Sequence, residues 1–448
     1  MQLPGVPPEL LQVLVAAADG RRVALVGGAV RDLLLHRVHN DPWRGLPDLD
    51  LVVEGTAAEI AADAPDRRPA PALARALRER LGLDQVPSIR EHGRFGTVEV
   101  ELRLSGAGSW LLDIASARQE AYPEPAENPV VRLGRLEDDL ARRDFTVNAI
   151  ALLLDADGRG VHLLDPHGGQ SDLATRTLRL LHHQSLCDDP TRLFRGARYA
   201  ARLGFALAPT SQAQAMEMIR QWPWTWCVGD PPGAAPPALG TRLRMELELL
   251  VEREPWPQAL RALQDWGGLA LLDAHLQGDA GWRRRLHWAQ RLQVPLPAAL
   301  VAGAADPLAL AERLQLPHRQ HRLLAQFLEL RSRLESPCLE PQEPGQSPSQ
   351  WCALLEAPGV SPEAVALAVA ADPAHRRPLL RWLFGWRHVK APVTPAVLIA
   401  AGVRPGPELG QRLQRERAAV LDADWLPGAA PGCQQAGPIT LPTTAASG

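Results

Sequence analysis

Short apolar runs alternate with amphipathic segments over the first 155 residues, which is typical of a mixed α/β domain. Val23–Val26 predicts a strand, Gly27–Gly28 a tight turn, and the residues after it a helix. Further strands are expected in "DLDLVVEG", "RFGTVEVEL" and "WLLDIASAR", and an amphipathic helix in "ALARALRERLGL". Two apolar runs surround a turn in "ALLLDADGRGVHLLDP" and predict a hairpin.

Beyond about residue 170 the pattern becomes helical and remains so. The Pro/Gly-rich stretches 222–240 and 336–350 interrupt it and predict surface loops or linkers. The last residues have the composition of a disordered tail. The predicted divisions are therefore an α/β head over 1–155, helical regions over 156–270 and 271–426, and a tail over 427–448.

Composition and charge restrict the classes of function. The net charge of −3 gives no global basic field, so any binding of nucleic acid must depend on local arginine clusters. The single lysine, Lys390, excludes a Walker-A loop and a kinase-type site. Five scattered cysteines without a CxxC pair, no signal-peptide pattern and no apolar run of membrane-spanning length predict a cytoplasmic protein without a membrane partner.

Two aspartates, Asp48 and Asp50, alternate in the predicted strand "PDLDLVVEG". Residues two apart in a strand share a face, so these carboxylates repel each other unless a cation lies between them. An isolated pair of this kind is most often a solvent-facing strand end. Here, however, the Gly27–Gly28 turn and Arg31 lie upstream, and a glycine turn before a helix is a natural phosphate cradle. The combination favours a Mg²⁺ and phosphate site.

A two-metal site usually takes a third carboxylate from a neighbouring strand. Asp113 lies in an otherwise apolar predicted strand and could supply it, although a strand-terminal pair with Arg118 explains Asp113 equally well.

The segment "LARRDFTVNAIAL" places polar side chains where the chain re-enters apolar sequence. The i,i+4 spacing of Asp144 and Asn148 predicts that they share a helical face. The segment is either a capped, solvent-exposed helix start or a site where Arg143 donates to a triphosphate. In the second case Asp144 and Asn148 orient the arginine or contact a ribose.

The segment "CDDPTRLFRGARYAARLGF" (187–205), taken as one helix, is apolar on one side. Its other side carries Arg192, Arg195, Arg198 and Arg202 with no interleaved Glu. A solvated charged face usually mixes signs, so this face is expected to bind phosphates. Asp189 lies three residues before Arg192, and the two could contact the edge of a base as acceptor and donor.

These segments resemble the class II tRNA nucleotidyltransferase and bacterial poly(A) polymerase family of the DNA polymerase beta superfamily. The matching stretches include "LVGGAVRDLLL", "DLDLVVEG", "LEDDLARRDFTVNAIAL", "LLDPHGGQSDLATRTLRLL" and "DDPTRLFRGARYAARLGF", and "GVRPGPELGQRLQRERAAVLDADW" resembles the tail of such enzymes. The resemblance is dense over residues 23–205. It implies an α+β fold: a polymerase-beta-like head with a mixed sheet and helices, followed by an all-helical neck, body and tail.

The resemblance also implies site residues. The catalytic and Mg²⁺-binding residues are expected to be Asp48, Asp50 and Asp113. The nucleotide-binding residues are expected to be Gly27, Gly28, Arg31, Arg143, Asp144, Asn148, Asp189, Arg192, Arg195 and Arg198. Three features depart from the family pattern: Asp188 replaces the usual Glu, the link "HRVHNDPWRGLP" is long, and the 222–240 stretch has the character of an insertion.

The implied activity is addition of C and/or A from CTP and ATP to the tRNA 3′ end, without a nucleic-acid template and with release of pyrophosphate. The motifs do not separate CCA, CC-only or A-only addition from poly(A) tailing. Two alternatives from other classes are a non-catalytic RNA-binding protein and transfer of nucleotides to a small molecule or protein. Retention of the carboxylates and arginines disfavours the first, and the arginine- and tryptophan-rich helices disfavour the second. No protein partner is implied.

Overall fold

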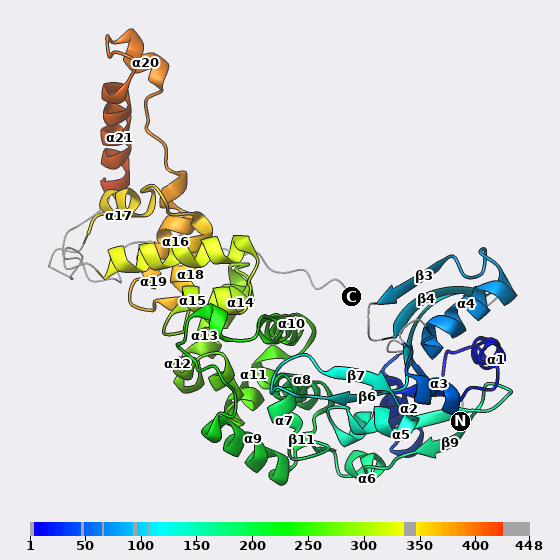
Figure 1. Ribbon diagram of the computed structural model, residues 1–448. Helices are drawn as coiled ribbons and strands as arrows, with labels where there is room; N and C mark the ends of the chain where they lie inside the picture. The colour runs from blue at the N-terminus through cyan, green and yellow to red at the C-terminus, as the bar shows by residue number, and fades with distance from the viewer. Residues whose placement is uncertain are drawn as a thin grey trace. The chain divides into compact units, whose positions relative to one another are not determined.

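The computed structural model describes residues 4–45, 49–64, 67–92, 96–104, 108–335 and 346–423 (Figure 1). The chain divides into two compact units, Met1–Leu271 and Leu272–Gly448. The predicted tail over 427–448 and most of the predicted linker over 336–350 lie outside the described residues.

A seven-stranded mixed sheet forms the centre of the first unit, in the order β3-β4-β5-β2-β1-β8-β9. Its strands are β1 (Val23–Val26), β2 (Leu49–Val53), β3 (Ser88–His92), β4 (Thr97–Leu104), β5 (Gly108–Ser116), β8 (Ala151–Leu154) and β9 (Gly160–Leu164). The pair β2 and β5 is parallel, and all other neighbouring strands are antiparallel. The predicted strands and the β8–β9 hairpin are confirmed.

Helices and a small second sheet surround this sheet (Figure 1). They are α1 (Pro8–Ala17), α2 (Gly28–Val38), α3 (Ala57–Ala62), α4 (Pro69–Leu81), α5 (Leu136–Ala141), the 3₁₀ helix η2 (Thr146–Asn148), and the antiparallel pair β6 (Arg118–Ala121) and β7 (Val130–Leu133). Leu136 and Leu140 of α5 pack in one buried cluster with Val26 of β1 and Val52 of β2. Because side chains alternate along a strand, α5 therefore covers the sheet face on which Val26 and Val52 lie.

The remainder of the first unit is mainly helical. Its elements are α6 (Gly169–Ala174), α7 (Ser185–Asp188), α8 (Arg192–Leu203), α9 (Pro209–Gln221), η3 (Pro232–Ala234), α10 (Pro237–Arg253), α11 (Trp256–Asp265) and η4 (Gly268–Leu271). The expectation of unbroken helical structure is wrong at one point, where the two-residue strands β10 (Thr177–Leu178) and β11 (Ala206–Leu207) pair in parallel.

The prediction of a single helix over 187–205 is also wrong. Helix α7 ends at Asp188, Asp189 is extended, and α8 begins at Arg192. The physical reason is Pro190, because a proline disfavours the helical conformation in the residue before it. The stretch 222–240 is more than a surface loop, because Trp224 and Trp226 are buried and α10 begins at Pro237.

In the second unit, the regular structure of the described residues is helical, as expected. The helices are α12 (Ala274–Gly278), α13 (Trp282–Arg291), α14 (Leu296–Val301), α15 (Pro307–Arg313), α16 (His318–Leu334), α17 (Pro348–Leu355), α18 (Pro362–Ala371), α19 (Arg376–Phe384), η6 (Trp386–His388), α20 (Pro395–Ala400) and α21 (Pro407–Asp422). Helix α18 is apolar and buried along most of its length, and it contacts α13, α16 and α19. It is therefore the centre of this unit's core. Across both units, none of the described helices has the length and apolar character needed to span a membrane.

Candidate active site

Two predicted carboxylates lie side by side on the sheet. Asp50 of β2 is the register partner of Asp113 of β5, and both line a cavity of about 610 Å³. Asp50 and Val52 share a face because they are two residues apart, and Val52 packs with Leu140 of α5. The carboxylates therefore lie on the face of the sheet that α5 covers. Asp48 lies outside the described residues.

The turn between β1 and α2 brings backbone close to this pair. Gly27 has φ of 66° and ψ of −136°, a conformation that favours glycine. A Cβ atom built at Gly27 would lie 3.2 Å from Asp50 Oδ2 and 3.4 Å from Arg143 Nη1. The missing side chain thus leaves space between a carboxylate and a guanidinium, as a phosphate cradle requires.

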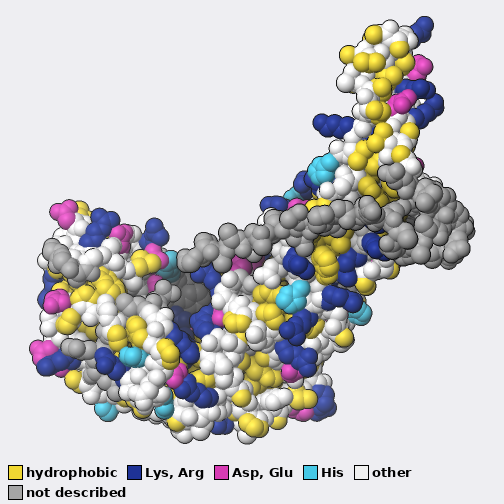
Figure 2. Space-filling model, turned by 180° about the vertical axis from the view of Figure 1, so that it is seen from behind, with side chains coloured by type: hydrophobic (Ala, Val, Ile, Leu, Met, Phe, Trp, Pro, Cys, Tyr) yellow, Lys and Arg dark blue, Asp and Glu magenta, His cyan; other side chains and the backbone are white. Residues whose placement is uncertain are grey.

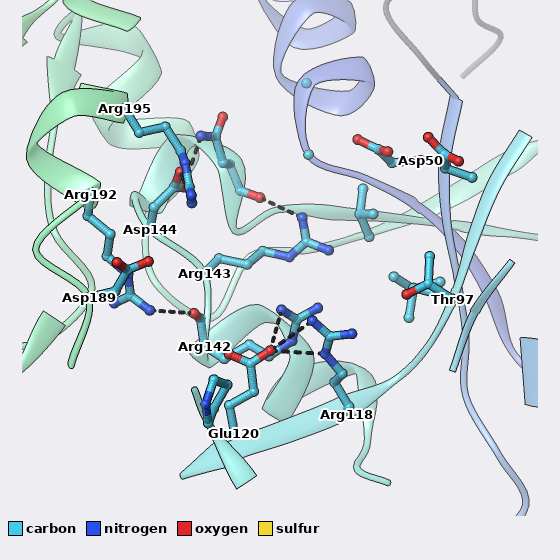
Figure 3. Close-up of a pocket in the computed structure, with 18 of the residues that line it drawn as sticks. Asp50, Thr97, Arg118, Glu120, Arg142, Arg143, Asp144, Asp189, Arg192 and Arg195 are labelled. Atoms are coloured by element: carbon cyan, nitrogen blue, oxygen red, sulfur yellow. Dashed lines mark hydrogen bonds and ion pairs between the residues drawn. The ribbon is translucent and has the colours of Figure 1, made fainter. Parts of the chain in front are cut away.

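Two arginines at the end of α5 are held by one carboxylate. Asp139, which is fully buried, accepts hydrogen bonds from Arg142 Nη2 at 2.7 Å and Arg143 Nη2 at 2.9 Å. Burial opposes its ionisation, but the guanidiniums of Arg143 and Arg142 hold the pKa of Asp139 below its usual range. Figure 3 shows Arg143 lying between Asp50 on one side of the cavity and Asp189, Arg192 and Arg195 on the other.

A chain of hydrogen bonds connects α2 with α8. Arg31 Nη1 donates to Asn148 Oδ1 at 2.9 Å, Asn148 Nδ2 donates to Asp144 Oδ1 at 3.0 Å, and Arg195 Nη1 lies 3.5 Å from Asp144 Oδ2. Burial opposes the charge of Asp144, but Arg195 and the bond from Asn148 hold the pKa of Asp144 below its usual range. The expected shared helical face is wrong: Arg143 and Asp144 form a bend, Phe145 forms a β-bridge with Leu180, and η2 begins at Thr146. The side chains meet through this bend.

The pair expected to contact the base lies at the junction of α7 and α8. Asp189 Oδ1 accepts from Thr191 Oγ1 at 2.6 Å and from the Thr191 backbone N–H at 3.2 Å. Arg192 Nη2 donates to the Arg142 carbonyl at 2.9 Å, while its Nη1 is buried and has no hydrogen-bond partner among the described residues. Both side chains line the cavity, which leaves the second nitrogen of Arg192 available to a ligand.

The arginine face of α8 is not a uniform phosphate-binding surface. Glu246 of α10 accepts from Arg195 Nε at 3.0 Å and from Arg198 Nη1 at 2.6 Å. Glu254 binds Arg202 and lies 3.4 Å from Arg198 Nε. Three of the four arginines therefore have carboxylate partners, from Glu246 in α10 and from Glu254 just after it. Phosphate binding by this face stays a prediction.

Most of the predicted residues converge. The cavity is lined by Gly27, Gly28, Asp50, Asp113, Arg143, Asp144, Asn148, Asp189, Arg192 and Arg195. Arg31 and Arg198 do not line the cavity. Arg31 donates to Asn148, which does line it, and Arg198 pairs with Glu246 of α10. Their roles stay predictions.

The sequence analysis missed a second group of lining residues. The cavity is also lined by Thr97, Arg118, Glu120, Tyr122, Asn128, Arg142, Tyr199 and Arg242. Glu120 accepts from Arg118 Nε at 3.0 Å, from Arg142 Nη1 at 3.1 Å and from the Tyr122 hydroxyl at 3.1 Å. The alternation of charge in "RQEAY" is a signal that could have identified Arg118, Glu120 and Tyr122 as site residues. No comparable signal in the sequence of α10 indicates Arg242.

Asp50 and Asp113 provide two carboxylates, which is fewer ligands than a complete metal site made of protein side chains needs. Over the described ranges, no group of three or more His, Cys, Asp or Glu side chains is arranged to hold a metal ion. Two carboxylates on one face suit a hard divalent cation that keeps water and phosphate oxygens in its remaining positions.

Comparisons with known proteins agree with this geometry. The poly A polymerase head domain matches residues 23–179. A CC-adding tRNA nucleotidyltransferase from Deinococcus radiodurans is 38% identical over 375 residues, which are 81% of this chain and 84% of the relative. The chain belongs to the class II tRNA nucleotidyltransferase family.

One other curated relative matches over a shorter segment, whereas two solved structures cover most of the chain. An A-adding tRNA nucleotidyltransferase from Halalkalibacterium halodurans is 39% identical over 193 residues, 43% of this chain and 38% of that protein. A solved apo CCA-adding enzyme covers 94% of this chain and 92% of its own, with a TM-score of 0.66 at 24% identity. A Thermotoga maritima CCA-adding enzyme complexed with tRNA has a TM-score of 0.61 at 23% identity. These two structures confirm the fold class, a mixed head followed by helices.

Proposed function

We propose that this protein adds C and/or A residues from CTP and ATP to the 3′ end of tRNA, without a nucleic-acid template and with release of pyrophosphate. The observation that carries the proposal is the convergence of three features in one cavity. These features are the carboxylates of Asp50 and Asp113, the glycine turn at Gly27, and the Asp189–Arg192 pair. Together they accommodate a reacting phosphate, its leaving group and a base.

Phosphoryl transfer needs positioning and charge stabilisation rather than a covalent nucleophile. Arg143 lies beside the glycine turn and is held by Asp139, so it is placed to bind the triphosphate. Arg142 and Arg118 share Glu120 on the neighbouring wall. Their fixed guanidiniums can bind phosphate oxygens without reorganising when charge builds up on the leaving group.

The residues present fit Mg²⁺, which stays a proposal. Asp50 and Asp113 would hold it, together with Asp48. When bound, Mg²⁺ would lower the pKa of the attacking hydroxyl and stabilise the departing pyrophosphate. The space at Gly27 is consistent with this arrangement, since a Cβ there would lie 3.2 Å from Asp50 Oδ2.

Selection of the base would depend on Asp189 and Arg192. Cytosine and adenine each present an amino group that can donate to the Asp189 carboxylate, whereas uracil and guanine present a carbonyl at that edge. A carbonyl facing Asp189 would leave two acceptors together, at a cost of about 1–3 kcal/mol. The buried second nitrogen of Arg192 can donate to the ring or carbonyl acceptor of the correct base.

The comparisons favour C addition as the first activity to test. The relative that matches across most of both chains is a CC-adding enzyme, whereas the A-adding relative from H. halodurans matches less than half of either chain. The cavity residues suit both bases, so the number and kind of nucleotides added are decided by experiment. The cytoplasmic location likewise stays a prediction.

The second unit offers a surface suited to RNA. Helix α13 turns Trp282 and Leu286 inward, while Arg283, Arg284 and Arg291 are exposed. Among the described residues, no ion pair joins these three arginines to a carboxylate. They line a cavity of about 440 Å³ together with Ala280, His287 and Trp288. Figure 2 shows arginine side chains in separate groups over the face that it draws, as local phosphate-binding patches require.

The test is incorporation of labelled CTP and ATP, supplied separately and together, into tRNAs that end before CCA, after C and after CC. Sequencing of the 3′ ends counts the nucleotides. Addition of one or two C residues supports the proposal and assigns CC addition, and a final single A extends it to CCA. A long A tail would instead identify a poly(A) polymerase. No incorporation with any tRNA would refute the proposal and favour a non-catalytic RNA-binding protein.

A further inference from the structure

Three tryptophans in the stretch 222–240 form a cluster. The ring centroids of Trp222 and Trp224 lie 5.0 Å apart, those of Trp222 and Trp226 lie 5.1 Å apart, and Trp224 stacks on Trp226 at 6.2 Å. Trp224 is 6% exposed and Trp226 is 1% exposed. Edge-to-face and stacked contacts at these distances are favourable, so residues 222–226 pack within the first unit and do not form an open surface loop.

One member of the cluster is bound to the helix that precedes the base-contacting pair. Trp224 Nε1 donates to the Cys187 carbonyl at 3.1 Å. Cys187 lies in the last turn of α7, where carbonyl groups have no intrahelical donor. The indole N–H of Trp224 therefore acts as a C-terminal cap for α7.

The residues just before α7 are held by α9, the helix that leads into the tryptophan cluster. Gln214 of α9 donates from Nε2 to the His182 carbonyl at 2.9 Å, and the tryptophans follow directly after α9. Gln214 of α9 thus holds the residues just before α7, and Trp224 holds the last turn of α7. A helix of only four residues has little stability of its own, so its position depends on these contacts.

The position of α7 determines where Asp189 lies. Only one residue separates Cys187 from Asp189, and Asp189 is already extended and lines the cavity. Trp224 is not among the lining residues, so it acts at a distance from the nucleotide. We propose that Trp224 is a positioning residue whose bond to the Cys187 carbonyl aims the Asp189 carboxylate at the base edge. This inference rests on the proposed function and deepens it.

A matched pair of variants separates positioning from simple packing. Trp222 Nε1 donates to the Trp226 carbonyl, a bond that stays within the cluster. Trp224→Phe and Trp222→Phe each remove one indole N–H and keep an aromatic ring in the same cluster. Only the first frees the carbonyl of α7, so only the first is expected to change base selection.

The experiment measures kcat/KM for CTP and for UTP with a tRNA that lacks CCA. Trp224→Phe is expected to lower the CTP-over-UTP ratio about 3- to 10-fold, the effect of one hydrogen bond, with the KM for tRNA unchanged. Trp222→Phe is expected to leave the ratio unchanged, and thermal melting of both variants checks the fold. Gln214→Ala is also expected to lower the CTP-over-UTP ratio, although it changes none of the three tryptophans.

A double-mutant cycle tests whether Trp224 acts through Asp189. Thr191→Val removes the hydroxyl that binds Asp189 Oδ1 at 2.6 Å, and its effect on the ratio should be non-additive with that of Trp224→Phe. An unchanged ratio in Trp224→Phe, or an equal loss in both tryptophan variants, would overturn the inference and leave the proposed function intact. Failure of the wild-type protein to incorporate CTP or ATP would instead overturn the proposed function, and this inference with it.

Discussion

Asp50 and Asp113 are direct neighbours on two parallel strands, although a loop, two helices and two strands separate them in the chain. Parallel neighbours lie about 4.8 Å apart and register partners present their side chains to the same face. Like charges at this distance are unfavourable without a cation. A divalent cation held between the two carboxylates would make this arrangement favourable.

Removing either charge should abolish catalysis without unfolding the protein. Asp50→Asn and Asp113→Asn are expected to lower the rate of CTP incorporation by about 1000-fold or more, since each removes a carboxylate that would hold the Mg²⁺ at the reacting phosphate. Both variants should keep the wild-type secondary structure, which far-UV circular dichroism checks. Single-turnover incorporation over a Mg²⁺ titration is the measurement, with Asp157→Asn in the exposed β8–β9 turn as the control. Wild-type rates in either variant would contradict the assignment.

A methyl group at Gly27 should lower the rate of incorporation, because it would occupy the space beside the Asp50 carboxylate. Gly27→Ala forces a positive φ on alanine, at about 1–3 kcal/mol, and places Cβ 3.2 Å from Asp50 Oδ2. Gly82 has φ of 82° and open space around its Cβ position, so Gly82→Ala carries comparable strain without the contact. Both variants should melt at a lower temperature, and only Gly27→Ala should lose incorporation, by about 10- to 100-fold. Equal activity in the two variants would argue against a phosphate site at this turn.

Asp189→Ala should relax nucleotide choice more than it slows the correct reaction. Without the carboxylate, the cytosine amino group loses its acceptor, and the uracil carbonyl no longer faces a second acceptor. The CTP-over-UTP ratio of kcat/KM is therefore expected to fall about 10- to 100-fold. The rate with CTP should fall less than this ratio. A variant that loses activity with CTP and UTP equally would show that Asp189 does not contact the base edge.

Asp139→Asn should reduce both stability and catalysis, because Arg142 and Arg143 lose the charge of the fully buried carboxylate that pairs with both of them. Loss of one partner of a buried ion pair costs about 3–5 kcal/mol, and displaced arginines should raise the KM for CTP. The pKa of Asp139 lies below its usual range in the folded protein. Its contribution is therefore complete above the ordinary carboxyl pKa and is lost as the pH falls through the lowered folded pKa.

Urea unfolding at pH 7, 5 and 3 checks this dependence. The stability gap between wild type and Asp139→Asn should persist from pH 7 to pH 5 and should narrow only below about pH 4. Asp138→Asn is the control, since it changes the net charge equally but removes only a bond to the Arg135 backbone N–H. A gap that stays constant at all pH values would show that the charge of Asp139 is not what stabilises the pair.

The exposed face of α13 should contribute to RNA affinity through charge. Arg283→Ala/Arg284→Ala is expected to weaken tRNA binding and to lower the slope of log affinity against log salt by about 1 to 2. Filter binding at several salt concentrations measures it, and incorporation at saturating tRNA should be unchanged. The control is Arg319→Ala/Arg333→Ala on α16, because both of these arginines already bind carboxylates. An equal slope for the two double variants would exclude α13 from the interface.

Local periodicity was enough to predict much of the head. The alternation in "LDLVV" predicted the direction of the Asp50 side chain, and the turn residues between β8 and β9 predicted that hairpin, because both properties depend on neighbouring residues alone. The order of the motifs predicted the family and the fold class. At Pro190 two local signals conflict: the amphipathic pattern around it predicts one continuous helix, whereas the proline predicts a break.

What the sequence alone determined is therefore most strands and helices of the head, the face on which strand side chains such as Asp50 lie, and which residue types are available for chemistry. The tertiary structure decided which of those side chains meet. Glu246 and Glu254 bind three arginines of α8, and Trp224 binds α7, through contacts between segments that are distant in the chain. Such partners depend on how helices pack, and the periodicity of one helix carries no information about the charges that its neighbour presents.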